Sequence, residues 1–410
     1  MMRFPGLFDH PTPRRMSTPS LDAENEPAKA TPIISDGGLQ AVEIHDERTI
    51  PIEFTGQAGV YFRIWIVNLC LTLLTLGIFS AWAKVRKKRY FYASVRIDDS
   101  PMQYLAEPIP ILKGRLVAAA LLFIWWFSSS FYLPALPWVL GAGLIIAPWI
   151  VASSAAFNAR YSAWRNLTFV FHGNYLGAAV TIYWLGLIPI VILGLMFDGS
   201  DSGIIGELVS ALGWLALLVI LAAGVLFPWW LNRLKRFIAT NTSYGTARVV
   251  YGARGGQFFG VYFMAGFILL LAAILSAMLA FFVGGIDPDS SSQLFLLTIP
   301  VYLGYVFAFA YVRANVTNLV WNQAHLGSVS FLSTMRGGEL FALYLTNALA
   351  IIATVGLAIP WAVMRTMRYR VEHLSARTDR PLSDFIGDDR SNVRAAAAET
   401  GDFFDLDLSL

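Results

Sequence analysis

Long apolar blocks separated by shorter polar segments make up most of the chain. Eight blocks can be distinguished, at residues 60–83, 116–133, 135–152, 175–197, 204–230, 258–283, 293–312 and 339–363. Several of them approach the ~20 residues that a helix needs to cross a bilayer. The pattern predicts an all-α polytopic membrane protein built of repeated transmembrane hairpins, with small cytosolic β-hairpins between them.

The composition fits this class. Hydrophobic residues make up 56% of the chain and charged residues 14%, whereas soluble proteins carry about 25% charged residues. The single cysteine, Cys70, lies in an apolar block, so no intrachain disulfide can form. We expect a disordered N-terminal tail at 1–50, a membrane domain of about five related units at 51–375, and a polar acidic tail at 376–410.

The Lys and Arg residues between the blocks predict which side of the membrane each connection faces. The connections at 134, 198–203 and 284–292 contain no Lys or Arg, whereas all the others do. Short loops rich in Lys and Arg stay in the cytoplasm. Blocks two to seven are therefore expected to form three hairpins that enter and leave on the cytoplasmic side, with 198–203 and 284–292 in the periplasm.

The first and last blocks leave two topologies open. Two full crossings there would place both tails outside, with Arg365, Arg368 and Arg370 on the side that Lys and Arg avoid. If instead 59–83 and 339–363 are re-entrant, six helices cross fully and both termini are cytoplasmic. Ordinary spans that contain a glycine are the alternative, and we favour re-entrance.

The two end blocks are related to each other. Laying 59–90 on 338–369 without a gap matches ten of the 32 positions. The matches include Thr-x-Gly in the middle of each block, at Thr75 and Gly77 and at Thr354 and Gly356. We expect the chain to reverse there, because glycine tolerates the positive φ of a sharp turn.

Short stretches with alternating side chains predict strands on the cytosolic side. S-V-R-I-D-D-S-P-M-Q-Y at 94–104 and A-R-V-V-Y at 247–251 alternate and carry turn residues beside or within them. Each of the five related units then has a strand, a hydrophobic hairpin, an aromatic stop and a basic exit. They start near Phe54, Tyr104, Phe171, Tyr251 and Phe331.

The search for chemistry yields few candidates. The deep parts of blocks two to seven hold no Asp, Lys, Arg or His, which argues against a proton-coupled pump. The five histidines lie outside the blocks without a partner at metal-ligand spacing. We therefore expect no catalytic residue, no metal and no cofactor, and not an enzyme.

Two equivalent asparagines are the main polar groups within the end blocks. Asn68 and Asn347 each lie seven residues before the Thr of Thr-x-Gly, hence two turns along one helix face. Together with Thr75, Gly77, Thr354 and Gly356 they could line a cavity that binds a neutral or anionic solute. Alternatively, the amides join helices, at a contribution of about 0.6–2 kcal/mol.

Clusters of Trp and Arg follow both blocks. They are expected to contact lipid headgroups or anions at the interface, or to serve as aromatic and cationic anchors that fix depth. Nucleic-acid binding is not expected, since the basic residues adjoin membrane ends. The residues concerned are Trp82, Arg86, Arg89, Trp361, Arg365 and Arg368.

Several motifs in the same order resemble a known family. They are N-L-C-L-T-L-L-T-L-G-I-F-S-A-W-A-K-V-R-K-K-R-Y, R-A-N-V-T-N-L-V-W-N and P-W-A-V-M-R-T-M-R-Y-R. Over residues 50–375 and the acidic, Leu-ending tail, the chain is similar to the YjgN-like bacterial inner-membrane proteins. That family has no assigned function, so the resemblance implies an inner-membrane location and no substrate, cofactor or catalytic residue.

Two function classes remain open. The first is a channel or transporter for a small solute or lipid, not proton-coupled; the alternative is a non-catalytic membrane scaffold that binds lipid or a protein partner. A cavity faced by Asn68 and Asn347 would favour transport, and amides bonded to neighbouring helices would favour the scaffold. Membrane lipids are the expected partners, with a small solute or a protein beside them. The sequence does not identify the substrate, the direction of transport or the oligomeric state.

Overall fold

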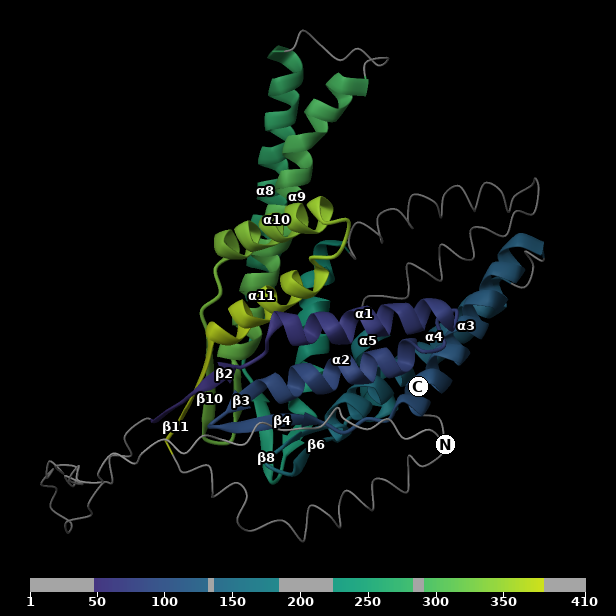
Figure 1. Ribbon diagram of the computed structural model, residues 1–410, viewed down its shortest axis with the longest axis vertical. Coiled ribbons are helices and arrows are strands. Elements are labelled where there is room, and N and C mark those ends of the chain that lie inside the picture. Colours follow the sequence, from purple (N-terminus) through teal and green to yellow (C-terminus); the bar gives the residue numbers. More distant parts are fainter. Residues whose placement is uncertain (1–47, 132–135, 184–223, 283–290, 380–410) are drawn as a thin grey trace, which may run out of the picture. The chain divides into compact units, whose positions relative to one another are not determined.

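A computed structural model describes residues 48–131, 136–183, 224–282 and 291–379 (Figure 1). Most of the two expected tails and of the blocks at 175–197 and 204–230 lies outside these residues. The expected periplasmic loop at 198–203 lies outside them entirely, and the one at 284–292 lies outside them up to residue 290. The described helices are α1 (Ala58–Leu74), α2 (Ser80–Ser94), α3 (Pro108–Phe131), α4 (Leu136–Arg160), α5 (Tyr175–Tyr183), an unlabelled helix over 224–240, α8 (Gly255–Phe282), α9 (Ser291–Asn322), α10 (Gly337–Ala353) and α11 (Ile359–Glu372).

An eleven-stranded antiparallel sheet joins these helices. Its order is β1-β11-β10-β9-β8-β7-β6-β5-β4-β3-β2. Only Pro51 separates β1 from β2, so the two ends of the order are adjacent in the chain and the sheet nearly closes on itself. The strands are β1 (Arg48–Ile50), β2 (Ile52–Phe54), β3 (Val95–Ile97), β4 (Ser100–Tyr104), β5 (Ser162–Trp164), β6 (Leu167–Phe171), β7 (Thr242–Tyr244), β8 (Ala247–Tyr251), β9 (Ala324–Leu326), β10 (Val329–Ser333) and β11 (Leu374–Thr378).

Apolar side chains hold the closure together. Ile50 is 2% exposed and shares one cluster with Ile97 of β3 and Leu326 of β9. β1 and β3 lie near opposite ends of the sheet order, so Ile50 and Ile97 meet only because the sheet curls. Burying such side chains contributes about 1.5–3 kcal/mol each.

Connections along the sheet alternate between tight turns and helices. Two-residue turns link β3 to β4, β5 to β6, β7 to β8 and β9 to β10, and left-handed residues such as Asp98 and Asp99 (φ 47° and 58°) permit them. The other neighbouring pairs are joined by helices, except β1 and β11, which are the first and last strands of the chain. In an antiparallel sheet, successive connections lie at opposite ends of the strands. The described helices therefore all leave from one end of the strands, which we call the helix rim. The tight turns lie at the other end, which we call the turn rim.

The same backbone contact recurs where helices meet the helix rim. In each case two paired strands are connected through helices. The residue that follows the first of the two strands donates its N–H to the carbonyl of the residue that precedes the second. The five bonds are Thr55 to Ser94 (2.9 Å), Leu105 to Tyr161 (2.9 Å), His172 to Asn241 (2.8 Å), Gly252 to Gln323 (2.9 Å) and Thr334 to His373 (3.0 Å). We call each strand–helix–helix–strand segment closed by such a bond a unit.

Side chains also join four of the five pairs of neighbouring units in one way. Arg89 of α2 donates to the carbonyl of Ala106 at 3.0 Å, and Arg236 donates to that of Ala253 at 2.7 Å. Asn318 of α9 makes the corresponding bond to the Met335 carbonyl at 2.8 Å. In the last unit Arg368 reaches the carbonyl of Gly56 in the first, at 3.3 Å. The final unit thus contacts the first in the way that consecutive units contact each other.

The expectation of an all-α protein with six full spans is wrong. The chain contains the eleven-stranded sheet, and four helices of the described residues are long and apolar enough to cross a membrane: 108–131, 141–160, 255–282 and 298–322. The strands have only three to five residues, too few to show a clear alternation. Their partners across the helices lie far away in sequence, so local patterns reveal little of the sheet.

Candidate functional site

The two short helix pairs, α1–α2 and α10–α11, contain most of the candidate residues. In each pair the chain reverses at Thr-x-Gly, and the two helices lie side by side (Figure 1). Gly77 has φ 93° and Gly356 has φ 91°. The predicted reversal at these glycines is what the structure has, and it uses the left-handed backbone that glycine adopts at little cost.

The two threonines stabilise these turns with matching hydrogen bonds. The Thr75 hydroxyl donates to the Leu71 carbonyl at 2.7 Å and accepts the Phe79 N–H at 2.9 Å. The Thr354 hydroxyl makes the same two bonds, to Ala350 and from Ala358, at 2.7 and 2.9 Å. Each hydroxyl therefore satisfies an N–H that the start of the following helix leaves free, and its carbonyl acceptor also receives the backbone N–H of the same threonine.

Exposed apolar side chains surround both turns. Leu76 is 95% exposed and Val355 is 94% exposed. A large exposed apolar patch marks a surface that binds a membrane or another protein. We call these two patches the apolar tips; they comprise Leu73, Leu74, Leu76 and Ile78 in the first pair, and Leu349, Ile352, Val355 and Leu357 in the second.

The two asparagines are buried inside their own helix pairs. Asn347 is 5% exposed, and its amide donates to the Ala362 carbonyl at 3.3 Å and to the Thr366 hydroxyl at 3.2 Å. Arg365 donates to its oxygen at 3.4 Å. Asn68 is 8% exposed and accepts a long bond of 3.5 Å from Arg86. Both amides therefore contact the neighbouring helix of their pair.

The Trp and Arg candidates divide into two roles. Arg365 lies 5.2 Å from the ring centroid of Trp361 and donates to the Thr346 hydroxyl at 2.7 Å. Trp82 stacks on Phe79 with the ring centroids 6.1 Å apart. By contrast, Arg89 and Arg368 use guanidinium groups to join units, as described above. Of the four arginines, Arg86 and Arg365 are thus the ones placed beside the asparagines.

At the end of each helix pair that lies away from its Thr-x-Gly turn, which we call the base of the pair, a tyrosine joins the two helices. The Tyr90 hydroxyl accepts the Gln57 N–H at 2.8 Å and donates to the Gln57 carbonyl at 2.9 Å. The Tyr369 hydroxyl makes the equivalent contacts with Arg336, at 3.0 and 3.3 Å. Each tyrosine therefore fastens the second helix of its pair to the residue just before the first.

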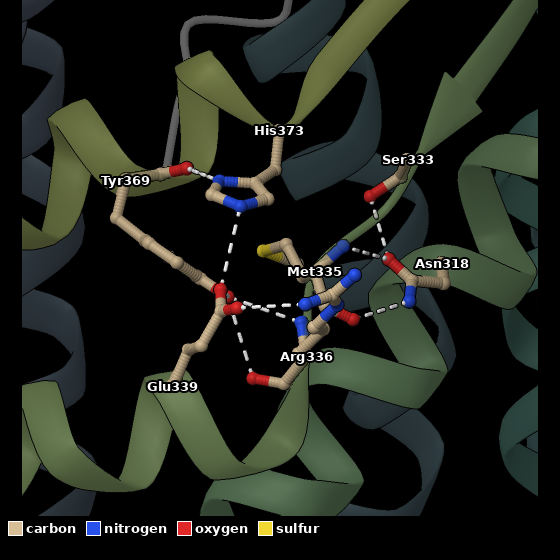
Figure 2. Close-up of polar contacts among 7 residues, drawn as sticks. All are labelled: Asn318, Ser333, Met335, Arg336, Glu339, Tyr369 and His373. Atoms are coloured by element: carbon tan, nitrogen blue, oxygen red, sulfur yellow. Dashed lines mark hydrogen bonds and ion pairs between the residues drawn. The ribbon is translucent and has the colours of Figure 1, made fainter.

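Figure 2 shows the additional polar groups at the base of α10–α11. Glu339 faces Arg336 at 3.3 Å, the Tyr369 hydroxyl at 3.1 Å and His373 Nε2 at 3.5 Å. His373 Nδ1 lies 2.8 Å from the Tyr369 carbonyl and must donate there, since a carbonyl only accepts. Nε2 of His373 consequently faces the Glu339 carboxylate.

This cluster is an extension of the tyrosine contact. Val60 and Ser94 occupy the positions of Glu339 and His373 in the first pair, and the Ser94 hydroxyl likewise donates to the Tyr90 carbonyl, at 2.7 Å. Within the described residues no group of three His, Cys, Asp or Glu could hold a metal. The contact between Glu339 and His373 joins the start of α10 to the end of α11.

The sequence did not reveal the roles of Tyr90, Tyr369, Arg89 and Arg368. All four are among the positions that match when the two end blocks are superposed. Their partners are backbone atoms, mostly in another element, and a backbone atom leaves no residue-type signal. The sequence therefore showed which positions match between the two end blocks, but not which atoms their side chains contact.

Comparison with known proteins identifies the family. Residues 49–403 match the family described as "Bacterial protein of unknown function (DUF898)". The inner membrane protein YjgN of Salmonella typhimurium is 22% identical over 373 residues, which cover 84% of this chain and 93% of that protein. The YjgN proteins of Escherichia coli O157:H7 and K12 are each 24% identical over 209 residues, covering 48% of this chain and 50% of theirs. No solved structure matches the chain.

The family match extends over most of the chain, and the relatives are inner membrane proteins. The resemblance to YjgN-like proteins that the motifs indicated is confirmed. This chain belongs to the DUF898 family of bacterial proteins of unknown function.

Proposed function

We propose that the protein is a non-catalytic scaffold of the bacterial inner membrane that crosses the membrane several times. Its two short helix pairs embed their apolar tips in the cytoplasmic leaflet, and its sheet forms a platform for partners at the membrane surface. The observation that carries this proposal is the nearly complete exposure of Leu76 and Val355 at the ends of helix pairs whose buried amides bond within the protein.

The positions of the arginines support insertion into one leaflet. Arg86 and Arg365 each lie six residues after the first residue of α2 or α11, which is about 9 Å of helix, and the long arginine side chain carries its guanidinium group further toward the interface. Half of the hydrocarbon core measures about 15 Å. When the tips reach the bilayer centre, both guanidinium groups therefore lie near the headgroups of the leaflet from which the pair entered. The same geometry supports re-entrance of 59–83 and 339–363, with both termini cytoplasmic.

The charge distribution supports the cytoplasmic leaflet. Lys88, Arg89 and Arg370 lie in the halves of α2 and α11 nearest the helix rim, and cytoplasmic segments are the ones rich in Lys and Arg. The sheet would then lie in the cytoplasm, because the same rim carries every helix.

The contacts of the asparagines favour a scaffold over a transporter. A solute path requires amides that face it, whereas the Asn347 amide donates to Ala362 and Thr366 inside its own pair. Buried polar groups that are already bonded stabilise helix contacts. Glycerol and chloride fluxes through proteoliposomes are accordingly expected to remain the same after Asn347→Leu, although the variant loses stability.

Depth measurements test the proposal directly. In a Cys70→Ala background, a fluorophore on Leu76→Cys or Val355→Cys is expected to be quenched most strongly by lipids brominated near the ends of their acyl chains. A fluorophore on Asp99→Cys, in a turn of the turn rim, serves as the control and should not be quenched. Labelling of Leu76→Cys by an impermeant reagent from the periplasmic side would refute insertion into one leaflet.

A further inference from the structure

An arginine of α11 is held in place by side chains from both helices of its pair. Arg365 Nη1 donates to the Thr346 hydroxyl of α10 at 2.7 Å and to Asn347 Oδ1 at 3.4 Å. The central carbon of its guanidinium group lies 5.2 Å from the ring centroid of Trp361, one turn earlier on α11. A cation and an indole ring attract each other at this distance. The guanidinium group therefore has a defined position, although the residue is exposed.

Hydrogen bonds also orient the two acceptors of this arginine. The Thr346 hydroxyl donates to the Ala342 carbonyl at 2.8 Å, so its oxygen can accept from Arg365. The Asn347 amide nitrogen donates to the Ala362 carbonyl at 3.3 Å, which identifies Oδ1 as the atom that accepts from the arginine. Every donor in this network thus faces an acceptor, and the network engages only Nη1 of the guanidinium group.

The other two guanidinium nitrogens keep their N–H groups available. Arginine carries five N–H donors in a planar fork, and both contacts above use Nη1. Within the described part of the chain, Nε and Nη2 of Arg365 make no hydrogen bond, and the ion pairs there have other partners. The acidic residues of α10 and α11 are Glu339 and Glu372, both at the base of the pair. No carboxylate of these two helices therefore neutralises Arg365.

The first helix pair has an equivalent arginine with less support. Arg86 occupies the position of Arg365 and makes one long contact of 3.5 Å, with Asn68. Val67 occupies the position of Thr346 and has no side-chain acceptor. Arg86 is consequently less firmly positioned, at the same distance from the start of its helix. It provides a matched comparison for Arg365 within the same protein.

We propose that Arg365 binds a phosphate group through Nε and Nη2. Two parallel N–H donors of a guanidinium group match two oxygens of a phosphate. The proposed insertion of the apolar tips brings Arg365 near the headgroups, so a phospholipid is the expected carrier of the phosphate; this part of the inference rests on the proposed function. A phosphate ester free in solution presents the same oxygens, and the experiment below separates the two sources.

Thermal unfolding of the delipidated full-length protein in a nonionic detergent tests the site. Dioleoyl phosphatidylglycerol is titrated beside dioleoylglycerol, which has the acyl chains without the phosphate, and glycerophosphoglycerol, which has the phosphate without the chains. Phosphatidylglycerol should raise the unfolding midpoint more than dioleoylglycerol does. Its apparent Kd should rise about tenfold in Arg365→Gln. Protection by the lipid but not by glycerophosphoglycerol identifies a lipid headgroup, and equal protection by both identifies a free phosphate ester.

Two further variants separate a defined site from general attraction to positive charge. Arg86→Gln removes the equivalent charge of the first pair and should leave the apparent Kd within about twofold of the wild type. Arg365→Lys keeps the charge but lacks the planar pair of donors, so it should also bind more weakly. Because Arg365 is exposed, both of its substitutions are expected to fold. The proposal is overturned if the two dioleoyl lipids protect equally, if Arg365→Gln and Arg86→Gln respond alike, or if Arg365→Lys binds as the wild type does.

This measurement is independent of the depth measurements on the apolar tips. It uses detergent instead of a bilayer, so it does not require Leu76 and Val355 to reach the bilayer centre. Protection that depends on Arg365, without quenching at the tips, would overturn insertion and keep the phosphate site. Quenching at the tips without such protection would overturn the phosphate site alone.

Discussion

Asn68 and Asn347 occupy equivalent positions, but their surroundings differ in ways that affect stability. The Asn347 amide has two acceptors on α11, and its oxygen accepts from Arg365. Asn68 has one long contact with Arg86, at 3.5 Å. Hydrogen bonds weaken with distance, so the amide of the second pair contributes more to joining its helices.

Replacement of the two asparagines should show this difference. Asn347→Leu is expected to lower the free energy of unfolding by about 1–2 kcal/mol, because it removes the bonds of the amide to the Ala362 carbonyl, the Thr366 hydroxyl and Arg365. Asn68→Leu serves as the matched variant and should cost less than half as much. Chemical unfolding of both variants in the same detergent measures the two values, and an equal loss would contradict the assignment.

The sequence could single out these asparagines but could not say what they bind. An Asn in an apolar block is rare enough to be noticed from composition alone. Whether its amide faces a cavity or a helix depends on where Ala362 lies, and that atom is placed by the packing of α10 on α11. Residue type therefore predicted a polar contact, and only the structure identified its partner.

At the scale of elements, the Thr-x-Gly turns were the feature that local chemistry predicts best. A glycine with positive φ and a threonine that bonds one turn backwards and forwards are both local properties. The strands around 94–104 and 247–251 were also predicted and are confirmed as β3, β4 and β8. Three-residue strands such as β5 and β7 were not specified as strands, because a single alternation is indistinguishable from a loop.

Alanine substitutions at four glycines test the turns. Gly77→Ala and Gly356→Ala should each destabilise by about 1–2 kcal/mol, since an L-residue is strained in the left-handed region. Gly59 and Gly338 are helical, and a Cβ at either would meet nothing within 4 Å. Their alanine variants should be neutral or stabilise by up to about 1 kcal/mol. Unfolding midpoints measure all four, and a stabilising Gly356→Ala would contradict the turn geometry.

At the scale of the whole described chain, the decisive interactions connect its two ends. β1 pairs with β11, with Arg48 opposite Thr378, and Arg368 reaches the Gly56 carbonyl. No local pattern could predict this pairing, because all the remaining described strands and helices lie between β1 and β11 in the chain. The same distance explains why an all-α membrane protein was expected: the helices are visible in the sequence, whereas the closure that positions them is not.

Chemical cross-linking tests the closure. In a Cys70→Ala background, Thr49→Cys and Arg377→Cys place thiols on directly opposed residues of β1 and β11, and a short bis-maleimide should join them in the folded protein. The matched pair Thr49→Cys with Val250→Cys puts the second thiol on β8, which β9 and β10 separate from β11, and should not be joined. Because a link between the two ends restricts the unfolded chain, the cross-linked protein should also unfold at a higher temperature. Joining of Thr49→Cys to Arg377→Cys only after unfolding would show that β1 and β11 are not paired in the native state.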